Sequence, residues 1–146
     1  MIRKATPEDI PRLVAMGTRF LTETVYCGRV LVNPDAMART LTLLLASDVG
    51  GLFVSEQDGT VTGMIGLLVF EHPFTGQLAA QELFWWVEPE HRAGGNALRL
   101  LKRGEQWAAA AGAHHVHMIA PTAAVGQLYE RLGYGYLETG YQKAIA

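Results

Sequence analysis

The feature that most constrains the fold is a change of hydrophobic period between residues 81 and 111. Residues 81–87 are rich in aromatic side chains, as in a buried strand, and Glu88-Pro89 ends this run. Beyond the glycine pair at 94 and 95, apolar residues recur at helical spacing up to Ala111. A strand is therefore expected to pass through a tight turn directly into a helix. The free N–H groups and the positive dipole end of such a helix favour an anion, such as a pyrophosphate.

The other segments alternate between strand and helix. Asp58-Gly59 is a tight-turn pair, and it predicts an antiparallel hairpin between residues 52–56 and 61–70. Helix-start signals at Thr6-Pro7 and Asn33-Pro34 open two helices before that hairpin. The remaining expected elements are a first strand at 2–5, a strand at 116–120, a helix at 123–132, and a tail at 134–145 that forms either one strand or a cramped hairpin.

This order predicts an α/β (α+β) fold with a mixed central sheet, antiparallel early and parallel late, flanked by about four helices. With 146 residues, 49% of them hydrophobic, the chain is expected to form a single domain over residues 1–146. The net charge of −2 gives no general attraction to nucleic acid or to anionic membrane. Cys27 is the only cysteine, and no apolar run reaches membrane-spanning length, so we expect a cytoplasmic protein without disulfides.

The turn after residue 87 differs from two common nucleotide-binding motifs. Residues 92–97 do not supply the G-x-G-x-x-G spacing of a Rossmann turn, and no Gly-Lys-Ser/Thr follows as in a P-loop. Gly94 and Gly95 would let the backbone approach a phosphate closely, and Arg92 would add a charged contact.

Two motifs carry a resemblance to the GNAT superfamily of N-acetyltransferases. Its signature V-x-P-x-x-R/Q-x-x-G-x-G/A is matched between Val87 and Ala97, and its segment l-Y-e-x-l-G-F/Y is matched by residues 128–134. The expected order of elements is also similar to that family over essentially the whole chain. The resemblance implies that acetyl-CoA is the co-substrate and that an amine is the acceptor. The implied cofactor-binding residues are Trp86, Val87, Arg92, Ala93, Gly94, Gly95, Asn96, Ala97 and Thr122.

The resemblance also implies that Tyr129 protonates the departing CoA thiolate. For the base, Glu82 is the best-placed carboxylate, and we expect burial beside Phe84 and Trp86 to raise its pKa. His117 and a water chain are alternatives for the base. Strand alternation places Trp85 in the core and Trp86 in the wall of the site. No metal is expected, although His114, His115 and His117 lie close in sequence.

The chain departs from the family pattern at the turn and before the last helix. Ala93, Gly94 and Asn96 stand where basic or bulky apolar residues are usual, and Thr122 stands where the family often has an asparagine. Thr122 could instead only cap the last helix. The alternative function is therefore a non-catalytic acyl-CoA-binding or regulatory module. The acceptor, a small molecule or a protein lysine or N-terminus, is not specified by the sequence, and neither is a homodimer.

Overall fold

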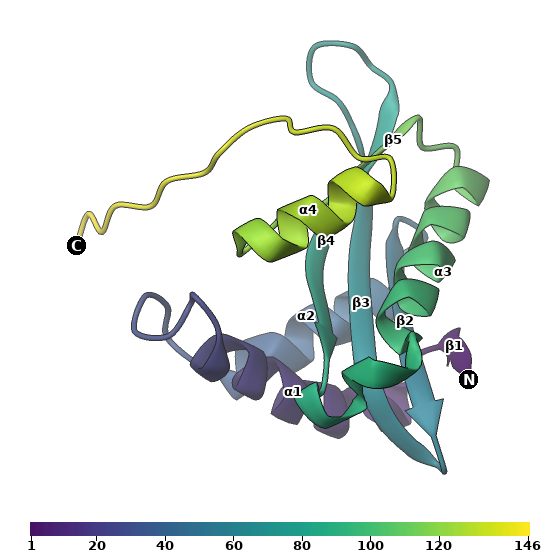
Figure 1. Cartoon of the computed structure of the whole chain (residues 1–146), viewed down its shortest axis with the longest axis vertical. Coiled ribbons are helices and arrows are strands. Elements are labelled where there is room, and N and C mark those ends of the chain that lie inside the picture. Colours follow the sequence, from purple (N-terminus) through teal and green to yellow (C-terminus); the bar gives the residue numbers. More distant parts are fainter.

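The computed structural model describes all 146 residues and contains one five-stranded sheet in the order β1-β2-β3-β4-β5 (Figure 1). The strands are β1 (Ile2–Lys4), β2 (Gly50–Gln57), β3 (Thr60–Glu71), β4 (Leu78–Val87) and β5 (His115–His117). The helices are α1 (Ile10–Glu23), α2 (Pro34–Ala46), α3 (Asn96–Ala110) and α4 (Ala123–Arg131), and two 3₁₀ turns, η1 (Pro7–Asp9) and η2 (Pro89–Gly94), precede α1 and α3. The predicted mixed sheet with about four helices is confirmed.

The first four strands pair antiparallel, and β4 pairs with β5 in parallel. Asp58 and Gly59 join β2 to β3 with φ angles of 51° and 76°. Positive φ at both central residues is what the twist of a two-residue hairpin turn requires, and an Asp-Gly pair accepts it readily. The predicted hairpin therefore forms where its turn residues indicated.

The helices cover the two faces of the sheet in pairs. In Figure 1, α3 and α4 lie in front of the sheet, whereas α1 and α2 lie behind it. The rear layer is a core cluster that includes Leu13 and Met16 from α1 with Leu41 and Leu44 from α2. The front layer is a second cluster, in which Leu100 and Leu101 of α3 pack with β2 and β3. Helices α1, α2 and α3 thus bury their apolar stripes against the sheet.

A β-bulge interrupts β4 at Leu83. Phe84 lies opposite Gly66 and Glu82 lies opposite Leu67, so Leu83 is an extra residue without its own partner on β3. Because one extra residue inverts the alternation, Glu82 does not share a face with Phe84 and Trp86, as we had expected, but lies on the opposite face with Leu67. The expectation that those two aromatics bury Glu82 is therefore wrong.

The C-terminal tail is also different from the prediction. Residues 135–146 form neither a strand nor a hairpin, and they run away from the sheet beyond α4 (Figure 1). Tyr136, Leu137 and Tyr141 are exposed, because the tail pairs with no strand of its own chain. Separately, none of the helices has the length and apolar composition needed to cross a membrane.

Candidate active site

The turn between β4 and α3 leaves the first turn of α3 open. Gly95 caps α3 with φ of 74°, a left-handed conformation that glycine adopts without strain, and no side chain caps the helix. The N–H groups of Asn96, Ala97 and Leu98 have no acceptor within the protein. Together with the helix dipole, these free donors form a site suited to an anion.

Two arginines lie at this turn. Arg92 donates from Nε to the carbonyl of Val87 at 2.9 Å, and its guanidinium lies 4.7 Å from the centre of the Trp86 ring. Arg99, which the sequence reasoning missed, donates from one Nη to the carbonyl of Gly94 at 2.6 Å and to Oδ1 of Asn96 at 2.7 Å. The signal for Arg99 was its position one helical turn after Gly95, which places both residues on the same side of the helix start.

Strands β4 and β5 separate shortly after they meet. They pair only from Ala79 to Gln81 on β4, so the edge of β4 beyond Gln81 has no strand beside it. On the other edge, the N–H of Glu88 donates to Thr62 of β3. Alternation along the ladder then turns the N–H of Trp86 toward β3 and the N–H groups of Trp85 and Val87 toward the open edge. This opening between the two strands is hereafter the splay.

Glu82 lies at the point where the splay begins. Its side chain is buried, and Oε2 accepts a hydrogen bond from the backbone N–H of Ile119 at 2.9 Å. Burial raises the pKa of Glu82 to about 7, and the hydrogen bond from Ile119 opposes part of that rise. The pKa moves in the expected direction, although the neighbours that cause it are different.

Tyr129 faces the same point from α4. Its hydroxyl donates to the carbonyl of Ile119 at 3.2 Å, and its ring stacks on Trp85 with 5.9 Å between centroids. Burial, and to a lesser extent the charge of Glu82, raises the pKa of Tyr129 above its ordinary value. The backbone N–H of Ile119 thus binds the carboxyl group of Glu82, and its carbonyl binds the hydroxyl of Tyr129. Ile119 therefore holds the two side chains beside each other at the splay.

The profile of the acetyltransferase (GNAT) family matches residues 18–134, which include the splay, the open turn and α4. The chain belongs to the GNAT acetyltransferase family. No curated protein matches it by sequence.

Solved structures of the same fold match this chain along almost its entire length. A transcriptional regulator from Bacillus halodurans C-125 shares 19% identity at a TM-score of 0.80, with 99% of each chain covered. A predicted acetyltransferase with acetyl-CoA from Clostridium acetobutylicum shares 18% identity at a TM-score of 0.80, covering 99% of this chain and 96% of its own. A ribosomal-protein-alanine N-acetyltransferase from Brucella melitensis biovar Abortus 2308 shares 17% identity at a TM-score of 0.77, covering 99% and 98%.

In this GNAT chain, a cavity of about 90 Å³ opens between Glu82 and Tyr129. Trp85 lines this cavity, whereas Trp86 is buried in the core cluster between the sheet and the first two helices. The expected roles of the two tryptophans are thus reversed. The bulge at Leu83 is the cause, because it brings Glu82 onto the face of Trp85 rather than that of Trp86.

Thr122, His117 and Cys27 do not line this cavity. Thr122 accepts from the N–H of Val125 at 3.3 Å and thus caps α4. The ring of His117 lies 6.2 Å from that of Phe70 and lines neither the 90 Å³ cavity nor its larger neighbour described below. No three His, Cys, Asp or Glu side chains come together in a way that could hold a metal ion. From the link after α1, Tyr26 lines the cavity, and Cys27 is exposed.

A buried carboxylate that the sequence did not reveal fixes α1 to the end of β4. Glu88 accepts from Arg12 at 3.0 Å, from Arg19 at 2.7 Å and from the indole N–H of Trp86 at 3.3 Å. Paired in this way, a carboxylate can remain buried at a tolerable cost. The result is a rigid junction between the first helix and the strand that leads into the open turn.

Proposed function

We propose that this GNAT protein is an N-acetyltransferase that moves the acetyl group of acetyl-CoA to a primary amine by direct attack in a ternary complex. The observation that carries the proposal is the arrangement around Ile119, whose N–H and carbonyl hold Glu82 and Tyr129 side by side where β4 and β5 separate. A base and an acid are what an acyl transfer from a thioester to an amine requires.

The residues of the open turn fit the pyrophosphate of CoA. The free backbone N–H groups of Asn96, Ala97 and Leu98 would donate to the phosphate oxygens, as helix starts do for other phosphates, and Gly94 and Gly95 would let the backbone approach those oxygens closely. The side chains of Arg92 and Arg99 would supply positive charge beside them, and Ala93 is exposed at the turn. Arg99 would thus replace part of the charge that the turn itself lacks.

The pantetheine arm would lie in the splay, along the unpaired edge of β4. Extended ligands commonly bind to an exposed strand through backbone hydrogen bonds. The N–H of Val87 points into this opening, so it is our candidate donor to the oxygen of the thioester carbonyl as negative charge develops there.

In the proposed reaction, the acceptor nitrogen attacks the thioester carbon, the C–N bond forms and the C–S bond breaks. Glu82 takes the proton that the amine loses, and with a pKa of about 7 it is partly ionised at neutral pH. Tyr129 gives its hydroxyl proton to the thiolate of CoA, and its raised pKa keeps that proton in place until then. Exchange with water afterwards restores both groups.

One observation favours a second candidate, a non-catalytic acyl-CoA-binding or regulatory module. The hydroxyl of Thr122 caps α4 and lies at a position where the family often places an asparagine that contacts the pantetheine arm. Such a module would bind CoA in the same turn and would transfer nothing. Binding without turnover on any amine distinguishes it from the enzyme.

The test is a screen for release of CoA thiol from acetyl-CoA with several classes of primary amine, including peptides with free N-termini. It is followed by a pH profile of kcat/KM for the wild-type protein and for Glu82→Gln. We expect the wild-type rate to rise through about pH 7 as Glu82 ionises, and we expect that inflection to be missing from Glu82→Gln. If the pH profile of kcat/KM is the same in Glu82→Gln as in the wild type, Glu82 is not the base.

A further inference from the structure

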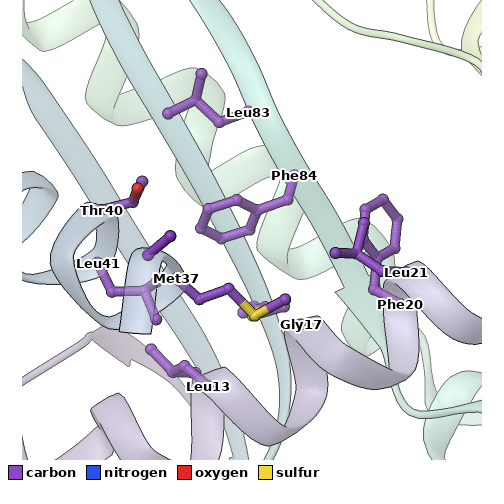
Figure 2. Close-up of a pocket in the computed structure, with 11 residues that line it drawn as sticks. Leu13, Gly17, Phe20, Leu21, Met37, Thr40, Leu41, Leu83 and Phe84 are labelled. Atoms are coloured by element: carbon purple, nitrogen blue, oxygen red, sulfur yellow. The ribbon is translucent and has the colours of Figure 1, made fainter. Parts of the chain in front are cut away.

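A second and larger cavity lies on the other side of β4, between the sheet and the first two helices (Figure 2). Its volume is about 300 Å³, at the lower end of the range for cavities that bind small molecules. Figure 2 shows Leu13, Phe20 and Met37 of the helices and Phe84 of β4 around it. The cavity is thus a site of suitable size that the chemistry at the splay does not use.

The large cavity is adjacent to the cavity of Glu82 and Tyr129. Phe20 and Leu83 line both, so these two side chains form the partition between them. Leu83 is the extra residue of the bulge and is 42% exposed. A molecule whose reacting nitrogen lies near Glu82 could therefore extend past these side chains into the large cavity.

The lining of the large cavity is almost entirely apolar. It contains no Asp, Glu, Lys, Arg or His, and its only polar side chain is that of Thr40 on α2. Across both cavities the one charged side chain is Glu82. A second ammonium or a carboxylate on the acceptor would lose part of its water against this lining without finding a charged partner, which is unfavourable.

We propose that the large cavity binds the non-reacting part of the acceptor, which is therefore a primary amine carrying one uncharged apolar group, either aliphatic or aromatic. This inference rests on the proposed N-acetyltransferase function, and it assigns the acceptor class. It disfavours polyamines and amines that carry a second charge, because only the reacting nitrogen would meet a carboxylate.

The test compares linear alkylamines from propylamine to hexylamine with the diamine that carries a second amine at the far end of the hexyl chain. Each added methylene that enters the cavity should raise kcat/KM about fourfold, as expected for burial of one CH₂ group. The diamine should be at least about tenfold poorer than hexylamine, since its second ammonium would be desolvated without a partner.

Two variants at Thr40 test the location. Thr40 is exposed and makes no hydrogen bond through its side chain, so substitution should leave the fold intact. Thr40→Asp should reduce the preference for hexylamine over the diamine by about tenfold, because it places a partner for the second ammonium at the cavity wall. Thr40→Val, which keeps the shape and removes the hydroxyl, should preserve or increase that preference.

The outcomes separate this inference from the function on which it rests. Turnover of the diamine equal to or faster than that of hexylamine would overturn the apolar acceptor class and leave the N-acetyltransferase proposal standing. An unchanged preference for hexylamine over the diamine in Thr40→Asp would show that the alkyl group does not bind in the large cavity. Absence of turnover with every amine would overturn the N-acetyltransferase proposal and the acceptor class together.

Discussion

Strand β2 pairs with β3 along its whole length, with one irregularity between Ser55 and Glu56, whereas β4 and β5 pair over three residues and then separate. The first pair is closed by a two-residue turn and is buried on both faces by the helices. Where the second pair separates, the backbone of β4 is unpaired, and a cavity lined by Glu82 and Tyr129 lies beside it. The comparison indicates that stability is concentrated in the long β2–β3 ladder and that the proposed catalytic groups lie where the β4–β5 ladder stops.

The largest expected effect is at the β4–β5 splay, where Tyr129 lies. Tyr129→Phe should lower kcat by about a hundredfold to ten-thousandfold, because it removes the proposed acid. Stability should fall by no more than about 1 kcal/mol, the usual contribution of one hydrogen bond. Single-turnover kinetics, with acetyl-CoA affinity measured in parallel, would check both expectations.

Tyr134→Phe is the matched control for this variant. The ring of Tyr134 lies 5.4 Å from that of Tyr129, but its hydroxyl donates to Glu105 rather than toward the splay. Its removal should leave kcat within about twofold of the wild type, since general acid catalysis is not affected. Equal losses of kcat in the two variants would indicate that packing, and not proton transfer, explains the effect.

Glu82 should make the stability of the protein depend on pH. Burial raises its pKa from 4.5 to about 7, so the folded state binds more protons than the unfolded state within that window. Below about pH 4.5 the buried carboxyl therefore does not reduce the free energy of unfolding. The reduction grows as the pH rises and reaches about 3 kcal/mol above pH 7.

Glu82→Gln stays neutral and can still accept a hydrogen bond from Ile119. Its free energy of unfolding should therefore increase relative to that of the wild type as the pH rises from 5 to 8. Urea unfolding at several pH values measures this difference in the free energy of unfolding. A difference that stays constant over this range would show that Glu82 titrates near its ordinary pKa and is not desolvated as the structure indicates.

A smaller effect is expected within the long β2–β3 ladder. A Cβ atom at Gly66 would lie 2.3 Å from the ring of Phe84, so Gly66→Ala must displace that ring. Displacement of a packed side chain typically costs about 1–3 kcal/mol. Gly126→Ala in α4 is the control, because its Cβ would meet only an ordinary contact at 3.7 Å and should stabilise the helix by about 0.5–1 kcal/mol. Thermal unfolding in which the two variants behave alike would contradict this account of the ladder.

Much of the architecture could be predicted from local sequence signals. The Asp58-Gly59 turn, the helix start at Asn33 and the open turn at Gly95 each follow from the conformational preferences of a few neighbouring residues. These preferences act over short distances along the chain. The local structure that such signals predict is therefore little changed by the rest of the fold.

The geometry of the site depended on contacts between distant segments, and the sequence could not reveal it. The bulge at Leu83 has no glycine or proline within β4 to announce it, and it reversed the expected faces of Glu82, Trp85 and Trp86. The tail carries a strand-like pattern but finds no partner strand in its own chain. Which edges are free is decided by tertiary pairing and not by local propensity.

The central claim is that the open turn at the end of β4 binds acetyl-CoA. Isothermal titration of acetyl-CoA into the wild type, Gly95→Val and Gly59→Val tests it directly. The two glycines have nearly equal φ angles, 74° and 76°, so valine imposes the same backbone strain at both, but only Gly95 lies at the proposed phosphate site. We expect the wild type and Gly59→Val to bind with similar affinity and Gly95→Val to lose at least about tenfold. Folded Gly95→Val that binds as tightly as the wild type, or a wild type that binds no acetyl-CoA at millimolar concentration, would contradict the claim.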